Sequence, residues 1–151
     1  MKKCYESSFK DRKEFDEIIE EYWQELSKGF YSKANFEQTK EFMWNPTADG
    51  YYVVVYRDSL TDEVVGLFMY SLGSPWWNNS LTILSEETTW ARRKGYGITR
   101  LVRDFLNRKL EDNTADVITS GGSIPETSSI VDNVYSKKDT FKSQKIYYKT
   151  R

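Results

Sequence analysis

The stretch RRKGYG, residues 92–97, places two glycines beside three cations directly ahead of a helical pattern. Glycine costs roughly 1 kcal/mol relative to alanine inside a helix, so the pair either turns the chain or lets it approach a ligand closely. The first turn of a helix carries unpaired backbone N–H groups and a partial positive charge, which together attract anions. We therefore expect an anion site, best suited to a pyrophosphate, formed by Arg92, Gly95 and Gly97 with the backbone N–H groups of residues 93–99.

Other nucleotide-binding motifs fit this stretch less well. The Walker-type phosphate loop ends in Gly-Lys-Ser/Thr, whereas Gly97 is followed by Ile98 and Thr99. A Rossmann fingerprint requires a third glycine three residues later, where Arg100 stands. On spacing alone, a connection whose glycines merely turn the chain, with basic residues on a solvated surface, is an equal alternative.

The composition excludes several classes of chemistry. The 151-residue chain has no histidine and a single cysteine, Cys4, which excludes a Ser-His-Asp triad, a Cys-His pair, an internal disulfide and a cysteine-based zinc site, and we expect no metal. Its 22 Lys and Arg balance 23 Asp and Glu, so no overall charge attracts nucleic acid or an anionic membrane. The sequence shows no signal-peptide pattern and no run of ~18 apolar residues, so we expect a cytoplasmic protein that does not span a membrane.

Hydrophobic periodicity places the glycine stretch in a chain of helices and strands. Apolar residues at helical spacing run over 15–26, preceded by Asp11 as an N-cap with Glu14 three residues later. A second clear stripe runs over 98–110, directly after the glycines. The other expected elements are a weaker helix over 36–44, a short helix after Pro125, and strands over 51–56, 64–72, 81–90, 115–124 and 141–150. This order indicates an α/β (α+β) fold.

The stretch RRKGYG is a full match to the signature Gln/Arg-x-x-Gly-x-Gly/Ala, and the chain resembles the GNAT superfamily of acyl-CoA-dependent N-acyltransferases. In that family the signature lies between the fourth strand and an amphipathic helix, and its N–H groups bind the pyrophosphate of coenzyme A. Downstream, residues 133–149 resemble the family's closing helix and strand, with Tyr135 at the family's tyrosine position. The resemblance implies one GNAT-like domain over residues 1–151, with a mixed, mostly antiparallel central sheet flanked by helices.

The activity that this resemblance implies is transfer of the acetyl group of acetyl-CoA to an amine by direct attack on the thioester. The acceptor is an amine-bearing small molecule or a protein or peptide. Tyr135 would return a proton to the sulfur of coenzyme A, within the reach of ~3 Å that proton transfer needs. The coenzyme would contact Glu87, Thr88 and Thr89 of the strand, and Arg92, Arg93, Lys94, Gly95, Tyr96, Gly97, Ile98 and Thr99 of the loop and first helical turn.

The base that deprotonates the amine is the least determined part of this mechanism. An ammonium group has a reference pKa near ~10, and in a chain without histidine the candidates are Glu86 and Glu87. Adjacent strand residues point to opposite faces, so at most one of the two faces the acceptor. An exposed carboxylate, or a salt bridge to Arg92 or Arg93, is the alternative for each. Strict alternation predicts one face with Leu81, Ile83, Ser85 and Glu87, and an opposite face with Thr82, Leu84, Glu86 and Thr88.

A departure from the family pattern keeps a second function open. The family strand usually ends in Val-x-Pro, whereas Glu87, Thr88 and Thr89 stand here. This difference favours the alternative of a non-catalytic GNAT-fold protein with a binding or structural role.

Overall fold

The computed structural model describes residues 2–28 and 32–120. Tyr135, the helix expected after Pro125 and the strand expected over 141–150 lie outside the described residues. The elements are, in chain order, β1 (Cys4–Ser7), α1 (Arg12–Leu26), α2 (Phe36–Trp44), the short 3-10 helix η2 (Pro46–Asp49), β2 (Tyr51–Asp58), β3 (Val64–Gly73), β4 (Ile83–Ala91), α3 (Ile98–Glu111) and β5 (Val117–Thr119).

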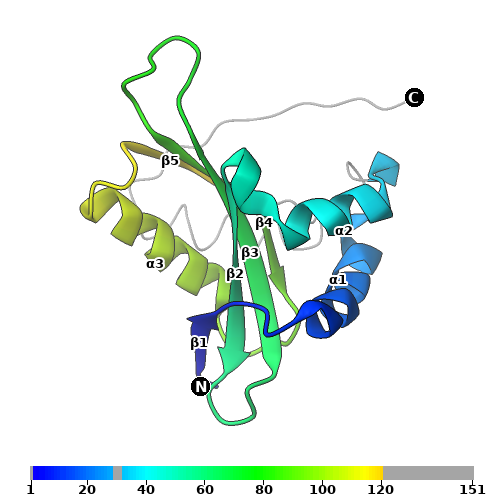
Figure 1. Cartoon of the computed structure of the whole chain (residues 1–151). Helices are drawn as coiled ribbons and strands as arrows, with labels where there is room; N and C mark the ends of the chain where they lie inside the picture. The colour runs from blue at the N-terminus through cyan, green and yellow to red at the C-terminus, as the bar shows by residue number, and fades with distance from the viewer. Residues whose placement is uncertain (1, 29–31, 121–151) are drawn as a thin grey trace.

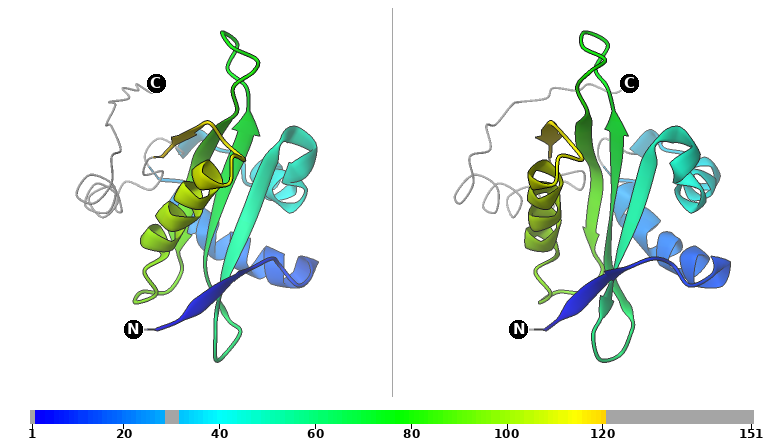
Figure 2. Two further views of the ribbon diagram at one scale, coloured as in Figure 1. Left: turned by 90° about the vertical axis from the view of Figure 1, so that its left-hand side faces the viewer. Right: turned by 60° about the vertical axis from the view of Figure 1, so that its left-hand side comes forward.

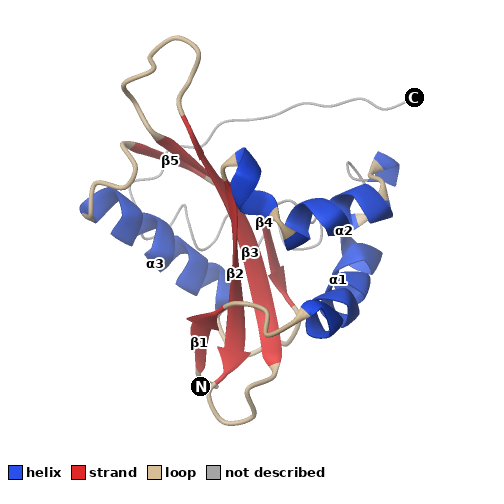
Figure 3. Ribbon diagram, in the orientation of Figure 1, coloured by secondary structure: helices blue, strands red, loops and turns tan. Residues whose placement is uncertain are grey.

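A five-stranded sheet in the order β1-β2-β3-β4-β5 forms the middle layer (Figure 3). The first four strands are antiparallel neighbours, and β5 runs parallel to β4. Helices α1 and α2 cover one face and α3 covers the other (Figure 1, Figure 2). The fold is therefore a mixed, mostly antiparallel sheet flanked by helices, which confirms the expected fold class.

The helices begin where the sequence supplies caps. The Asp11 side chain accepts a hydrogen bond from the backbone N–H of Glu14 at 2.8 Å, and Asn35 accepts one from Gln38 at 3.0 Å. Such caps satisfy donors that the first helical turn leaves unpaired, and each stabilises a helix by about 1 kcal/mol. The predicted helices over 15–26 and 36–44 are confirmed, and α1 begins at Arg12, directly after the predicted cap Asp11.

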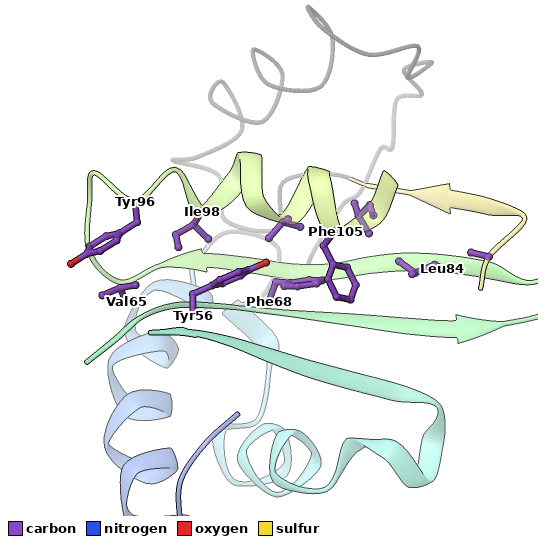
Figure 4. Packing of buried hydrophobic residues seen from close by; sticks show 10 residues of the cluster. Tyr56, Val65, Phe68, Leu84, Tyr96, Ile98 and Phe105 are labelled. Carbon is purple, nitrogen blue, oxygen red and sulfur yellow. The ribbon is translucent and has the colours of Figure 1, made fainter. Parts of the chain in front are cut away.

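Each face of the sheet has its own hydrophobic core. On the face covered by α3, Phe105 meets Phe68 of β3 with ring centroids 5.0 Å apart, as Figure 4 shows. On the opposite face, Tyr22 of α1 meets Trp90 of β4 with centroids 5.6 Å apart. Residues of β4 belong to both cores, and the start of α3 belongs to the first. The glycine stretch connects the end of β4 to the start of α3.

A bulge in β4 changes which face its side chains occupy. Met69 pairs with Thr88 and Tyr70 pairs with Glu86, so Glu87 lies opposite no residue of β3 in the register of the two strands. Leu84 packs in the core under α3, whereas Thr88 binds Tyr22 of α1 on the opposite face. The prediction that Leu84, Glu86 and Thr88 share a face was therefore wrong for Thr88, because strict alternation cannot continue through an inserted residue.

Two further differences concern the sheet edges. The edge strand β1 was not predicted, and β5 covers Val117–Thr119 of the strand expected over 115–124, whose residues 121–124 lie outside the described part of the chain. Across residues 2–28 and 32–120, no helix has both the length and the apolar content needed to cross a bilayer.

Candidate functional site

Both glycines of the RRKGYG stretch adopt backbone conformations that other residues rarely reach. Gly95 has φ +92° and Gly97 has φ +66°, and Gly97 is the N-cap of α3. No side chain caps this helix, and the N–H of Leu101 makes a helical bond to the carbonyl of Gly97 at 3.1 Å. The backbone N–H groups of residues 98–100 precede that bond and have no helical acceptor. The start of α3 is thus an open set of donors with the positive end of the helix dipole behind it.

The first cation of the stretch points away from these donors. Arg92 makes two bonds to Glu21 of α1, at 2.8 and 2.9 Å, and a third to Glu63 at 3.1 Å. Its guanidinium is mostly buried, and it holds the pKa of Glu21 below its ordinary value. The Arg92 side chain therefore ties the loop to α1 and to the turn before β3.

The next two cations are at the surface. Arg93 is half exposed and its guanidinium lies 2.9 Å from Glu63, while its backbone N–H donates to the carbonyl of Val65 at 3.1 Å. Lys94 is exposed. Thr99 is partly exposed in the first turn of α3, whereas Ile98 is buried beneath it. Of the backbone donors expected over residues 93–99, that of Arg93 is thus already used within the fold.

Tyr96, between the two glycines, points into the protein. Its ring is buried, and its hydroxyl donates a hydrogen bond to the Asp58 carboxylate at the end of β2. This bond is the largest cause of two pKa shifts: it raises the pKa of Tyr96 to about 12 and lowers the pKa of Asp58 to about 2. The buried side chain of Tyr96 therefore fixes the loop to the end of β2, whereas Gly95 and Gly97 on either side of it are exposed.

The described pairing of β4 with β5 ends several residues before the glycine loop. Their pairing covers Ile83 to Ser85 of β4, and Ser85 opposite Thr119 is the last pair. Beyond it, the Glu86 carboxylate accepts hydrogen bonds from the hydroxyls of Thr89 and Ser120. Within the described part of the chain, no strand pairs with this edge of β4 after Ser85.

A pocket of about 470 Å³ lies on the other face, between α1, α2 and the bulge of β4. Glu87 and Thr88 both line it, because the bulge places them on the same side. The Glu87 carboxylate accepts a hydrogen bond from Ser71 at 2.6 Å, and Thr88 receives one from Tyr22 at 2.8 Å. The remaining described lining is Leu26, Lys33, Ala34, Asn35, Gln38, Thr39, Phe42, Met43 and Met69.

Several solved structures named as acetyltransferases share the fold of this chain. A ribosomal-protein-alanine N-acetyltransferase from Brucella melitensis biovar Abortus 2308 matches with a TM-score of 0.67 and 14% identity, over 98% of each chain. A predicted acetyltransferase from Clostridium acetobutylicum, determined with acetyl-CoA, matches at 0.65 and 11% identity, over 100% of this chain and 96% of that one. An aminoglycoside acetyltransferase from an uncultured soil metagenomic sample, in complex with sisomicin, matches at 0.64 and 13% identity, over 98% and 94%. No family model and no curated protein sequence matches the chain.

The chain has the GNAT fold. The resemblance drawn from RRKGYG and its surroundings is confirmed at the level of fold. Tyr135 lies outside the described residues, so its role rests on the sequence resemblance.

Several residues of this GNAT-fold site gave no signal in the sequence. Ser71 and Tyr22 contact the two pocket residues of β4 from positions 16 and 66 residues away. Asp58 and Glu63 hold the glycine loop from 38 and 29 residues away. Nothing in their local spacing marks them, because the sheet pairing alone brings them to the site.

Proposed function

We propose that this protein is an N-acetyltransferase that moves the acetyl group of acetyl-CoA to an amine, within one GNAT-like domain over residues 1–151. The observation that carries the proposal is the start of α3 at Gly97, which no described side chain caps, together with the part of β4 that follows its last described pair with β5 at Ser85. The first feature suits the pyrophosphate of coenzyme A, because backbone N–H groups and a helix dipole favour an anion. The second suits the pantetheine arm, whose amides can bond to a strand edge. A GNAT-fold neighbour determined with acetyl-CoA supports the same choice of co-substrate.

Within the proposed site, the coenzyme contacts Glu87, Thr88 and Thr89 through backbone groups of β4. A backbone N–H there would stabilise the oxyanion that forms when the amine attacks the thioester carbonyl. Tyr135 would then protonate the leaving thiolate, by resemblance to the family. These assignments give this part of β4 a chemical task in addition to binding.

Glu87 is the proposed general base. Its carboxylate lines the pocket and is held by Ser71 at 2.6 Å, whereas Glu86 is bonded to Thr89 and Ser120 near the separation of β4 and β5. An amine in this pocket would lie beside Glu87 on one side of β4 and approach the thioester at the strand edge. Loss of its proton to Glu87, directly or through water, would leave the lone pair free to attack.

The alternative is a GNAT-fold protein that binds coenzyme A without turning it over. The strand end Glu87-Thr88-Thr89, in place of the family's Val-x-Pro, favours this second candidate. It predicts coenzyme binding with no release of free thiol for any amine.

Two measurements separate the candidates. Titration calorimetry with coenzyme A and acetyl-CoA tests whether the site binds the coenzyme. If it does, free ligand at a concentration of 100 times its Kd should also raise the free energy of unfolding by about 2.7 kcal/mol. A screen of acetyl-CoA against a panel of amines, read through thiol release, then tests transfer, and Tyr135→Phe should slow release without weakening binding. Binding without release favours the non-catalytic candidate, and absence of binding at millimolar coenzyme overturns both.

A further inference from the structure

The turn between β2 and β3, residues 58–63, is joined to the glycine loop by side chains at both of its ends. At the first end, Asp58 accepts the hydroxyl of Tyr96. At the second end, Glu63 accepts from Arg92 at 3.1 Å and from Arg93 at 2.9 Å. The bonded residues of this turn lie 29 to 38 residues before their partners in the loop, yet the fold brings the turn and the loop into direct contact.

The Asp58 carboxylate couples the shape of the turn to the position of Tyr96. One oxygen, Oδ1, accepts the backbone N–H groups of Leu60 at 2.7 Å and Thr61 at 2.8 Å. The other oxygen, Oδ2, accepts the Tyr96 hydroxyl. Both oxygens are therefore engaged, so the carboxylate has a fixed orientation and Tyr96 is bonded to a rigid acceptor.

The loop is packed as closely as it is bonded. The N–H of Arg93 donates to the carbonyl of Val65 at 3.1 Å, and the guanidinium of Arg92 donates to the carbonyl of Val64 at 2.9 Å, so two bonds join the loop to β3. A Cβ added at Gly66 would lie 2.9 Å from the Cδ1 of Ile98, so only glycine lets the start of α3 rest on β3 at this distance. On the outer side, the side chain of Lys2 lies against Gly95, with its ammonium 5.5 Å from the centre of the Tyr96 ring.

Tyr96 is the residue through which these contacts control the backbone. It lies between Gly95 and Gly97, which are the residues with the greatest conformational freedom in the loop. Left unsupported, a Gly-x-Gly segment would sample many conformations, and ordering it would weaken ligand binding. Fixing the central side chain at both its ring and its hydroxyl restricts the two glycines on either side.

We propose that Asp58 is a positioning residue for coenzyme A, which acts through Tyr96 to hold the N–H groups at the start of α3 in their pyrophosphate-binding arrangement before the ligand arrives. The inference rests on the proposed coenzyme site. Asp58 does not touch the ligand. Positioning by Asp58 would strengthen coenzyme binding. Its negative charge by itself would weaken the binding of an anion nearby, so the two effects of the same carboxylate have opposite signs.

The opposition between charge and positioning makes the test sharp. Asp58→Asn removes a negative charge, so electrostatics predicts tighter coenzyme binding and positioning predicts weaker binding. Tyr96→Phe removes the hydroxyl with no change of charge, and positioning predicts the same loss. We expect calorimetric Kd values for coenzyme A to rise about tenfold in each variant, with little further rise in the double variant. Asp58→Asn replaces the charged acceptor of the Tyr96 hydroxyl with a neutral amide and Tyr96→Phe removes that hydroxyl, so both act on the same contact.

Two controls separate positioning from general damage. Tyr5→Phe removes a matched tyrosine–carboxylate bond, from Tyr5 to Asp62 of the same turn, that does not reach the loop. Its Kd for coenzyme A should equal that of the wild type. Pantetheine, which lacks the pyrophosphate, should bind Asp58→Asn and Tyr96→Phe as it binds the wild type, whatever their melting temperatures.

The outcomes are distinguishable. Unchanged or tighter coenzyme binding by Asp58→Asn and Tyr96→Phe overturns the positioning role while leaving the proposed function intact. An equal loss of pantetheine and coenzyme affinity also overturns it, because the defect then lies outside the phosphate site. Failure of the wild type to bind coenzyme A overturns the proposed function, and the positioning role with it.

Discussion

Glu87 and Thr88 follow one another along β4 and line the same pocket. Consecutive residues of a regular strand point to opposite faces. Here the bulge opposite Met69 and Tyr70 leaves Glu87 out of the residue-by-residue pairing with β3 and places both side chains toward α1 and α2. The sheet thereby presents a carboxylate and a hydroxyl side by side, each held by a hydrogen bond from another strand or helix.

Removal of the Glu87 carboxylate should slow transfer without loosening the coenzyme. In Glu87→Gln we expect kcat to fall by about 10² to 10⁴, the range for loss of a general base, with KM for acetyl-CoA unchanged. Thiol release with an accepted amine measures both values. Glu86→Gln is the matched control, since that carboxylate bonds Thr89 and Ser120 instead of lining the pocket. Full activity in Glu87→Gln would remove it from the mechanism.

A carboxylate at the start of α3 should abolish coenzyme binding. Gly97→Glu brings a negative charge to the proposed pyrophosphate position, where a Cβ meets no described atom within 4 Å. Gly97→Asn is the control, because Asn tolerates a positive φ and is uncharged. Calorimetry should find no binding in the first variant and weakened binding in the second, with circular dichroism showing both folded. Wild-type affinity in Gly97→Glu would place the coenzyme elsewhere.

The acceptor should carry one cation on an apolar body. The charged residues among the described pocket lining are Glu87 and Lys33, and Phe42, Met43 and Met69 supply apolar surface. A polyamine would bring several cations to a pocket with one described carboxylate, and unmatched charges are costly. Thiol release should therefore give a kcat/KM at least about tenfold higher for 2-phenylethylamine than for spermidine or sisomicin. The reverse order would contradict this assignment.

Stability in acid should depend on the buried Arg57. Its guanidinium binds Glu14, the hydroxyl of Ser7 and two backbone carbonyls, and it holds the pKa of Glu14 below its ordinary value. A folded-state pKa below the unfolded one, ~4.3, stabilises the protein above that pH, and the contribution is lost as pH falls through the folded value. The free energy of unfolding of Arg57→Met should be about 3 kcal/mol lower than that of the wild type near pH 7. The difference between the two proteins should be smaller below pH ~4.

The surface pair of Arg93 with Glu63 provides the control for that experiment. Arg93 is half exposed, so Arg93→Met should change the free energy of unfolding by at most about 1 kcal/mol at either pH. Denaturant unfolding of the three proteins at pH 7 and pH 3 measures the differences. An Arg57→Met deficit that is constant with pH would show that Glu14 titrates alike in the folded and unfolded chains.

The sequence predicted the elements that rest on local signals. The helices α1 and α3 and the strands β2 and β3 follow from apolar spacing, and Asp11 caps α1 as expected. The helix predicted directly after the glycines begins at Ile98, and Gly95 and Gly97 have positive φ values that few other residues reach. Edge strand β1 could not be predicted, since Cys4–Ser7 has no clear alternation and becomes a strand only by pairing with β2.

The site was harder to predict than the fold, for a physical reason. Arg92 was expected to add positive charge for an anion, but its bonds to Glu21 and Glu63 depend on the packing of α1 and the β2–β3 turn. The bulge at Glu87 leaves no trace in the hydrophobic pattern, because it is defined by the pairing with β3. Contacts between distant segments decide what each side chain does, and a local pattern carries no information about them.

The contact between Lys2 and Gly95 has a practical consequence for handling the protein. The side chain of Lys2 lies 3.6 Å from where a Cβ on Gly95 would be. A segment added for purification at this end would therefore be attached close to a residue whose side chain contacts the loop proposed to hold the coenzyme. An affinity tag at that end would compete for space with the ligand and bring its own charges to the phosphates. Measurements of coenzyme affinity are best made after such a tag has been cleaved.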